Sequence, residues 1–158
     1  RVYGADSDLT CLPVRGLTLF ASVGLLDTRL GAFATTAGQV AAGNKLPNAP
    51  GVTFTGRARY EFAVTSGIDL SISGSAHYSD SVFKDATNNP VIAGDSYWLF
   101  DARVGIAGAD KGWEVALWGR NLSDNRHVMQ GLDTGALGFG NRTYNAPRTY
   151  GVTATVRF

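Results

Sequence analysis

The side chains best suited to chemistry lie far apart in this sequence. His77 and His127 are the only histidines, and neither has a second histidine or a cysteine at a metal-ligating spacing. Asp80, Asp85 and Asp95 flank one segment, but their spacing does not match a regular calcium-binding loop. Motifs for a nucleophile elbow or a phosphate-binding loop are missing as well. The sequence therefore predicts no metal site, no cofactor and no enzymatic activity.

Charged side chains alternate with apolar ones along several segments. Phe54 and Tyr60, for example, occupy one phase of the alternation, and Arg57 occupies the other. A period of two places the two sets on opposite faces of a β-strand, whereas a helix would spread the charges around its surface. The polar phase can line a water-filled route, although a solvated wall of mutually paired charges is the simpler interpretation. Six charged residues are assigned to this polar face: Arg57, Arg59, Glu61, Asp101, Arg103 and Arg120.

The alternation predicts about seven strands, most of them longer than the usual soluble strand of about 5–6 residues. A strand of about eleven residues rises about 3.3 Å per residue, and at a tilt of about 45° it crosses about 25 Å. That is the height of the apolar band on a membrane barrel. The predicted strands are residues 2–12, 17–25, 52–62, 68–78, 98–106, 113–120 and 150–158.

Tight and long connections alternate along the chain. Glycine-bearing turns suit hairpins, and the longer segments between them suit loops. This asymmetry is typical of outer-membrane barrels, which have short periplasmic turns and longer extracellular loops. The fold class predicted is therefore an all-β, antiparallel, up-and-down transmembrane β-barrel. The turns are expected at residues 14–16, 65–67 and 109–112, and the long connections at about 30–50, 82–95 and 126–147.

Composition excludes several other classes. The net charge of +1 gives no electrostatic reason to expect nucleic acid as a partner. Apolar residues make up 44% of the chain, which excludes a disordered protein, and no run of about 18 apolar residues predicts a transmembrane helix. Cys11 is the only cysteine and is interpreted as a strand residue. The opening residues resemble a strand rather than a signal peptide, so the chain is expected to begin inside a larger protein.

Three stretches resemble TonB-dependent outer-membrane receptors. Residues 44–50 (NKLPNAP) are similar to the family's passage from an extracellular loop into a late barrel strand. Residues 113–127 (WEVALWGRNLSDNRH) resemble a strand that ends in an Asn-Leu-x-Asp segment with a basic residue beyond it. Residues 147–158 (PRTYGVTATVRF) resemble the family's last strand with its terminal phenylalanine. The order and spacing also match, so the resemblance covers nearly the whole chain.

The middle stretch carries the most detailed match. Asn121, Leu122 and Asp124 fit the Asn-Leu-x-Asp pattern. Two positions depart from the family, because His127 and Val156 stand where aromatic residues are frequent.

The resemblance implies a barrel of 22 strands whose lumen is filled by an N-terminal plug. Residues 1–158 would supply about the last seven strands, and the plug and the TonB-contact segment would precede Arg1. The polar face would then face the lumen, and the apolar face would contact the lipid of the bacterial outer membrane. The last strand would carry a signal for the barrel assembly machinery, which an exposed sheet edge suits physically. The residues assigned to that signal are Tyr150, Val152, Val156 and Phe158.

The function implied is TonB-driven uptake of a scarce nutrient, with an iron–siderophore complex first and a vitamin or carbohydrate as the alternative. The connection at 126–147 is rich in glycine, aromatic and amide side chains, which suits substrate capture and equally suits an ordinary flexible loop. Its candidate binding residues are Phe139, Asn141, Arg142 and Tyr144.

Two rival interpretations remain from the sequence. A small passive barrel of about eight strands has the same alternation, and so does a soluble β-sandwich. Strand length and loop asymmetry favour the membrane barrel. Seven strands alone would leave open edges and an apolar surface, so the isolated chain is expected to aggregate in water.

Overall fold

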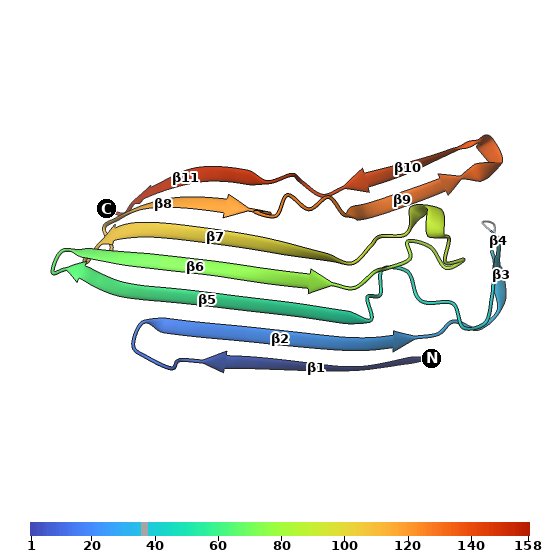
Figure 1. Cartoon of the computed structure of the whole chain (residues 1–158), viewed down its shortest axis with the longest axis horizontal. Helices are drawn as coiled ribbons and strands as arrows, with labels where there is room; N and C mark the ends of the chain where they lie inside the picture. Colours follow the sequence, from blue (N-terminus) through green and yellow to red (C-terminus); the bar gives the residue numbers. More distant parts are fainter. Residues whose placement is uncertain (36–37) are drawn as a thin grey trace.

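The computed structural model describes residues 1–35 and 38–158, and its main feature is one antiparallel sheet (Figure 1). Its seven strands follow the chain order β1-β2-β5-β6-β7-β8-β11. These strands are β1 (Val2–Cys11), β2 (Leu17–Thr28), β5 (Val52–Thr65), β6 (Ile68–Ser79), β7 (Tyr97–Gly108), β8 (Trp113–Arg120) and β11 (Thr149–Val156). The predicted all-β, antiparallel architecture is confirmed, with all seven strands close to their expected bounds.

Two small hairpins lie outside this sheet, within connections that the sequence predicts as loops. They are β3 (Phe33–Thr35) with β4 (Gly38–Val40), and β9 (Val128–Thr134) with β10 (Phe139–Tyr144). Two short 3₁₀ helices, η1 (Pro90–Ile92) and η2 (Gly135–Leu137), complete the elements. The strands of these hairpins are short, so their alternation is too brief to stand out in the sequence.

All short turns lie at one end of the sheet and all long connections at the other (Figure 1). The turns at residues 12–16, 66–67 and 109–112 join β1–β2, β5–β6 and β7–β8. The connections at residues 29–51, 80–96 and 121–148 join β2–β5, β6–β7 and β8–β11 and carry both hairpins. We call these two ends the turn end and the loop end. The asymmetry predicted from glycine placement is present.

Strand register sorts the side chains into two faces. Phe54, Tyr78 and Trp98 oppose one another across β5, β6 and β7. Directly opposed residues point to the same side of a sheet, so these three rings lie on one apolar face. The next pair along the same two strands, Thr55 and His77, points to the opposite face, which is polar. The alternation read from the sequence therefore persists across neighbouring strands.

The apolar face is exposed because no second layer formed by residues 1–35 and 38–158 covers the sheet. Val104 and Leu117 are paired across β7 and β8, yet they are 45% and 62% exposed. A soluble sandwich would bury such residues against a second sheet, and a surface of this kind normally marks contact with lipid or protein. Of the apolar side chains described, those buried are Val40, Ile92, Ala116 and Val128. The soluble sandwich is therefore not the architecture of this chain.

Aromatic side chains gather near both ends of the apolar face. At the loop end, the Trp98 ring lies 5.0 Å from that of Tyr78, 5.8 Å from Phe100 and 5.9 Å from Phe54. At the turn end, the rings of Tyr60 and Phe62 are 5.0 Å apart. Two aromatic groups that flank an apolar band are typical of membrane barrels.

The sheet is open. Within the described ranges, β1 pairs only with β2 and β11 only with β8, so each outer strand has an unpaired edge. No helix in the part described has the length and hydrophobicity needed to span a membrane.

Candidate functional site

The polar face is hollowed at mid-height, where β5, β6, β7 and β8 form a cavity of about 390 Å³. Its floor is set by register, since Arg57 opposes Ser75, which opposes Asp101, while Arg59 and Arg103 both oppose Ser73. All six charged residues predicted for one face lie on this face. Glu61 sits closer to the turn end, and the other five line the hollow: Arg57, Arg59, Asp101, Arg103 and Arg120.

Positive charge dominates the hollow. Arg59 pairs with Glu61, and Arg103 pairs with Glu114, each at 2.7 Å. Neither Arg57 nor Arg120 has an ion pair among residues 1–35 and 38–158. These two guanidinium groups keep donors for an anion or a carboxylate, because an arginine presents five N–H groups.

Aromatic rings hold the two unpaired arginines. The Arg57 guanidinium lies 5.5 Å from the centre of the Phe20 ring, and that of Arg120 lies 5.2 Å from the Trp118 ring. Contacts of this kind are worth about 0.5–1 kcal/mol at exposed sites and restrict where the cation can move. Asp101, a carboxylate that also lines the hollow, accepts the Asn121 backbone N–H at 2.8 Å.

Trp118 is a residue that the sequence analysis did not single out. Its indole Nε1 donates to Thr153 Oγ1 at 3.1 Å, and its ring covers Gly151, where any Cβ would overlap it. Residue type suggests the apolar face for a tryptophan, but Trp118 shares its parity with Glu114 and Arg120. That parity is the signal in the sequence that places it on the polar face.

A second cavity, of about 330 Å³, lies at the loop end of the same face. It brings together the two histidines, which are distant in sequence and were assigned no role. The rings of Tyr97 and His127 stack with centroids 3.6 Å apart and an angle of 4° between their planes. The His77 ring lies 6.1 Å from that of Tyr97, and its Nδ1 is 3.1 Å from Thr55 Oγ1.

Burial and nearby charge change the ionisation of this cavity. The pKa of His127 is lowered chiefly because the ring is removed from water, and further by the positive charges of Lys84 and His77. Burial also lowers the pKa of Lys84, whose Nζ donates to Asn48 Oδ1 at 3.1 Å. His127 Nδ1 is buried and has no hydrogen-bond partner in the described part of the chain.

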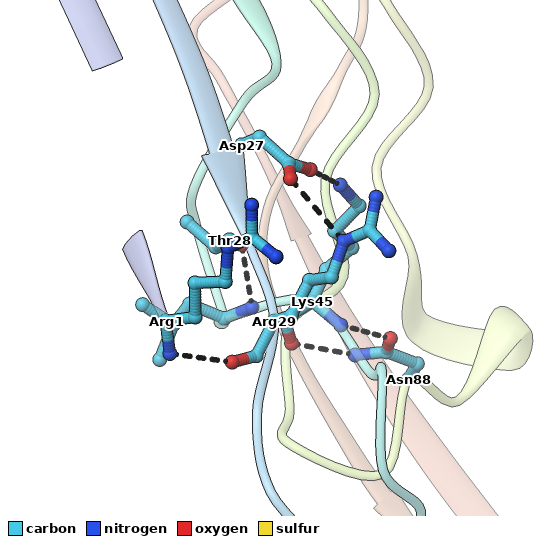
Figure 2. A network of polar contacts seen from close by, with 7 residues as sticks. Arg1, Asp27, Thr28, Arg29, Lys45 and Asn88 are labelled. Atoms are coloured by element: carbon cyan, nitrogen blue, oxygen red, sulfur yellow. Dashed lines mark hydrogen bonds and ion pairs between the residues drawn. The ribbon is translucent and has the colours of Figure 1, made fainter. Parts of the chain in front are cut away.

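Polar contacts connect the loops at this end (Figure 2). Asn88 holds the backbone of Lys45 from both sides: its Oδ1 accepts the N–H at 2.6 Å, and its Nδ2 donates to the carbonyl at 2.9 Å. The Lys45 ammonium also reaches Asp27 at the end of β2, at 2.5 Å, and Arg29 contacts the same carboxylate at 3.2 Å. These contacts therefore join the first and second long connections to each other at the loop end of the sheet.

The Asn-Leu-x-Asp segment forms a clasp at the base of the third connection. Asn121 is 7% exposed, and its Nδ2 donates to the carbonyls of Asn125 at 2.9 Å and Ala146 at 3.1 Å. Its Oδ1 accepts the Asn125 N–H at 3.0 Å. Asp124 accepts the Arg148 N–H at 2.8 Å. The pattern noted in the sequence thus ties the two ends of residues 121–148 together.

The four candidate substrate residues lie on β10, in a hairpin rather than an irregular loop. Phe139 and Tyr144 are 60% and 44% exposed, while Asn141 is paired in register with Leu132. The Arg142 guanidinium donates to the Val91 carbonyl, which attaches the hairpin to η1. Of the described residues that line the two cavities, none is one of these four. Their role in binding remains a prediction.

The last strand carries three of the four residues of the expected assembly signal along an open edge; β11 ends at Val156, so Phe158 lies two residues beyond it. Tyr150, Val152, Val156 and Phe158 are all at least 66% exposed. Register places the first three opposite Gly119, Leu117 and Trp113 of β8, respectively. Recognition by the assembly machinery remains a prediction as well.

Sequence comparison assigns the family. A model of the family described as TonB dependent receptor-like, beta-barrel, matches residues 1–122. The chain belongs to the TonB-dependent receptors. Residues 44–50 and most of 113–127 fall within the match, whereas 147–158 lie beyond it. TonB-dependent receptor barrels are proteins of the bacterial outer membrane, so the exposed apolar face of this TonB-dependent receptor chain is the surface that meets lipid.

Solved structures of other proteins share the fold over nearly the whole of this 158-residue TonB-dependent receptor chain. The siderophore receptor PiuA from Acinetobacter baumannii is 24% identical, with a TM-score of 0.75 over 97% of this chain and 21% of that one. The ferric yersiniabactin uptake receptor FyuA from Yersinia pestis is 16% identical, with a TM-score of 0.85 over 99% and 23%. The ferric preacinetobactin receptor BauA from Acinetobacter baumannii is 18% identical, with a TM-score of 0.70 over 97% and 21%.

The chain therefore spans about a fifth of the length of these three structures. At this identity the likeness establishes the fold. The family and the three structures are receptors, which agrees with the expectation of a non-enzymatic role.

Proposed function

We propose that this chain forms part of the barrel of a receptor that imports an iron–siderophore complex across the outer membrane with energy delivered through TonB. The family match carries the proposal, and three similar structures are named for siderophores or their ferric complexes. The arginine-rich hollow adds supporting chemistry, because it suits an anionic complex better than a neutral one. Vitamin or carbohydrate uptake by a receptor of the same family is the second candidate.

The polar face is proposed to line the lumen and to face the plug expected before Arg1. Arg57, Arg59, Arg103 and Arg120 would then offer cations to carboxylates of the plug or to a passing substrate. The same proposal assigns contact with TonB to a segment that precedes this chain. A small passive barrel is the rival, and it would need neither a plug nor TonB.

Iron transport tests the proposal directly. A strain lacking the gene that encodes this chain is compared with its parent for uptake of radioactive iron, presented with a panel of siderophores under iron limitation. Uptake of at least one complex should disappear in the deletion strain and in a strain without TonB. If uptake survives loss of TonB, the passive barrel is correct. If only a vitamin or sugar depends on the gene, the alternative within the family is correct.

The role of the hollow is tested by substitution. Arg57→Ala combined with Arg120→Ala should reduce uptake of the dependent complex several-fold, because both unpaired cations are removed. Arg57→Lys with Arg120→Lys preserves the charge and should retain much more of the activity. Folded receptor levels are compared by heat-modifiable mobility. Equal uptake by both double variants and the unaltered receptor would exclude a role for this charge.

A further inference from the structure

The loop-end cavity of the polar face has the features of a ligand site in its own right. It lies where β5, β6 and β7 meet the three long connections. Among the described residues in its lining, the titratable groups are Lys84 and Asp95 from the second connection, His77 from β6, Tyr97 from β7 and His127 from the third connection. Val128 and Met129, which complete the wall on that side, are uncharged. Four separate segments thus contribute titratable groups to the lining of one cavity.

Two of these groups keep hydrogen-bonding capacity that the described residues do not use. The Lys84 ammonium has three N–H donors, and the hydrogen bond described for it goes to Asn48 Oδ1. His127 Nδ1 is buried with no partner among the residues described, which is costly unless another group satisfies it. The stack on Tyr97 fixes the plane of the imidazole, so the ring is already oriented for a ligand.

The charge of the cavity depends on its two histidines. With both imidazoles neutral, the positive charge of Lys84 is offset by the negative charge of Asp95. Burial beside Lys84 and His77 favours that neutral form, since it lowers the pKa of His127. An anion placed between Lys84 and His127 reverses this preference, because it stabilises the imidazolium.

We propose that this cavity binds a small aromatic anion, with its negative group between Lys84 and His127 and its ring near Tyr97, and that His127 takes up a proton as the anion binds. The inference rests on the proposed function in one respect, since the polar face must be open to water at the cell surface. It goes beyond that function by placing one ligand subsite and assigning its chemistry.

Proton uptake fixes the direction of the pH dependence. When the pH is above the ordinary pKa range of histidine, the anion either binds beside a neutral imidazole or binds together with a proton, and taking up that proton costs free energy. As the pH falls, the imidazolium becomes available and affinity for the anion rises. Affinity becomes constant once His127 is protonated with and without ligand. A ligand that carries no charge gains nothing from the proton.

Calorimetry with benzenesulfonate tests the proposal, because this aromatic probe keeps its charge across the pH range. The receptor is purified in detergent from outer membranes, and benzenesulfonamide serves as the neutral probe of the same shape. Benzenesulfonate should bind several-fold more tightly at about pH 5.5 than at about pH 8, approaching the roughly tenfold limit that one unit of pKa difference sets. Titrations in buffers of different ionisation enthalpy should show net proton uptake on binding.

Substitutions separate the two parts of the site. His127→Phe keeps an aromatic ring against Tyr97 and should abolish the pH dependence and the proton uptake. Lys84→Gln should weaken binding at every pH and leave the dependence in place. Lys111→Gln is the matched control. Lys111 lies at the turn end, far from the cavity, where its ammonium pairs with the Asp69 carboxylate at 2.7 Å. It should leave both quantities unchanged, and heat-modifiable mobility confirms that each variant is folded.

The inference is overturned if benzenesulfonate and benzenesulfonamide bind equally, or if His127→Phe retains the pH dependence. Iron uptake is measured in parallel with the same variants. Uptake without pH-linked anion binding would reject this subsite and leave the proposed function standing. Anion binding of the expected kind, without uptake of any ferric complex, would reject the proposed function and leave the subsite standing.

Discussion

Tyr97 and His127 stack almost parallel, with ring centroids 3.6 Å apart, although thirty positions separate them in the sequence. Tyr97 is the first residue of β7, and His127 comes directly before β9. The stack therefore connects the main sheet to the β9–β10 hairpin. An aromatic contact of this kind adds about 0.5–1.5 kcal/mol beyond the area that it buries.

The attachment of this hairpin should weaken in mild acid. The folded pKa of His127 lies below its ordinary value of 6.5, which we take for the unfolded loop. The stabilisation from neutral His127 is therefore complete above the ordinary value and declines as the pH falls through the lowered pKa. Hydrogen exchange of residues 128–144, corrected for the intrinsic rate, should show less protection at about pH 5.5 than at about pH 8. Protection that is independent of pH, or a dependence that persists in His127→Phe, would contradict this.

Asn121→Ala should destabilise the clasp by about 2–3 kcal/mol, because it removes the buried amide that donates to the carbonyls of Asn125 and Ala146 and accepts the Asn125 N–H. Urea unfolding in detergent micelles measures the loss. Ser123→Ala is the neighbouring control, since Ser123 is exposed and its contacts are 3.4 Å or longer. Its effect should stay within about 0.5 kcal/mol. A similar loss in both variants would show that the turn, and not the Asn121 amide, is responsible.

Val104→Arg should cost about 2–4 kcal/mol in a lipid bilayer, provided that Val104 lies near the bilayer midplane. Val104 lies between Ile72 and Leu117 on the apolar face, so the new charge would face hydrocarbon. Guanidinium unfolding in phospholipid vesicles gives the free energy. Val104→Leu changes size without charge and should be close to neutral. If the arginine variant is as stable as the leucine variant, this face does not contact lipid.

Phe158→Ala should reduce assembly of the receptor into the outer membrane several-fold, whereas Phe158→Tyr should assemble normally. The physical reason is that the open edge of β11 can pair with another strand, and an aromatic end group adds an anchor. Pulse labelling followed by the heat-modifiable fraction in isolated outer membranes gives the rate. Normal assembly of the alanine variant would remove Phe158 from the signal.

The two faces and the turn positions were accessible from the sequence because they depend on local rules. A period of two decides where Arg57 and Phe54 point, and a glycine-bearing turn decides where the chain reverses. The position of Trp118 on the polar face could be predicted from its parity with Glu114 and Arg120, although a tryptophan is more readily expected on the apolar face. The predicted strand bounds are close to those observed because strands of this length repeat the pattern several times.

The structure of the loop end could not be predicted from the sequence in the same way. β9 and β10 are too short for alternation to distinguish them from loop sequence. The meeting of His77 with His127 depends on the course of two long connections, which no local pattern encodes. The lowered pKa of His127 depends in turn chiefly on burial of the ring, and further on the charges of Lys84 and His77, which other segments bring there.

The clasp from Asn121 to Arg148 has a consequence for how loops of this protein can diverge or be redesigned. It fixes where β8 ends and where the chain returns toward β11, independently of the sequence between them. The β9–β10 hairpin can therefore be exchanged as a cassette at a constant pair of junctions. Grafted segments of different length would leave the register of β8 with β11 unaltered, so this loop can change without rebuilding the sheet.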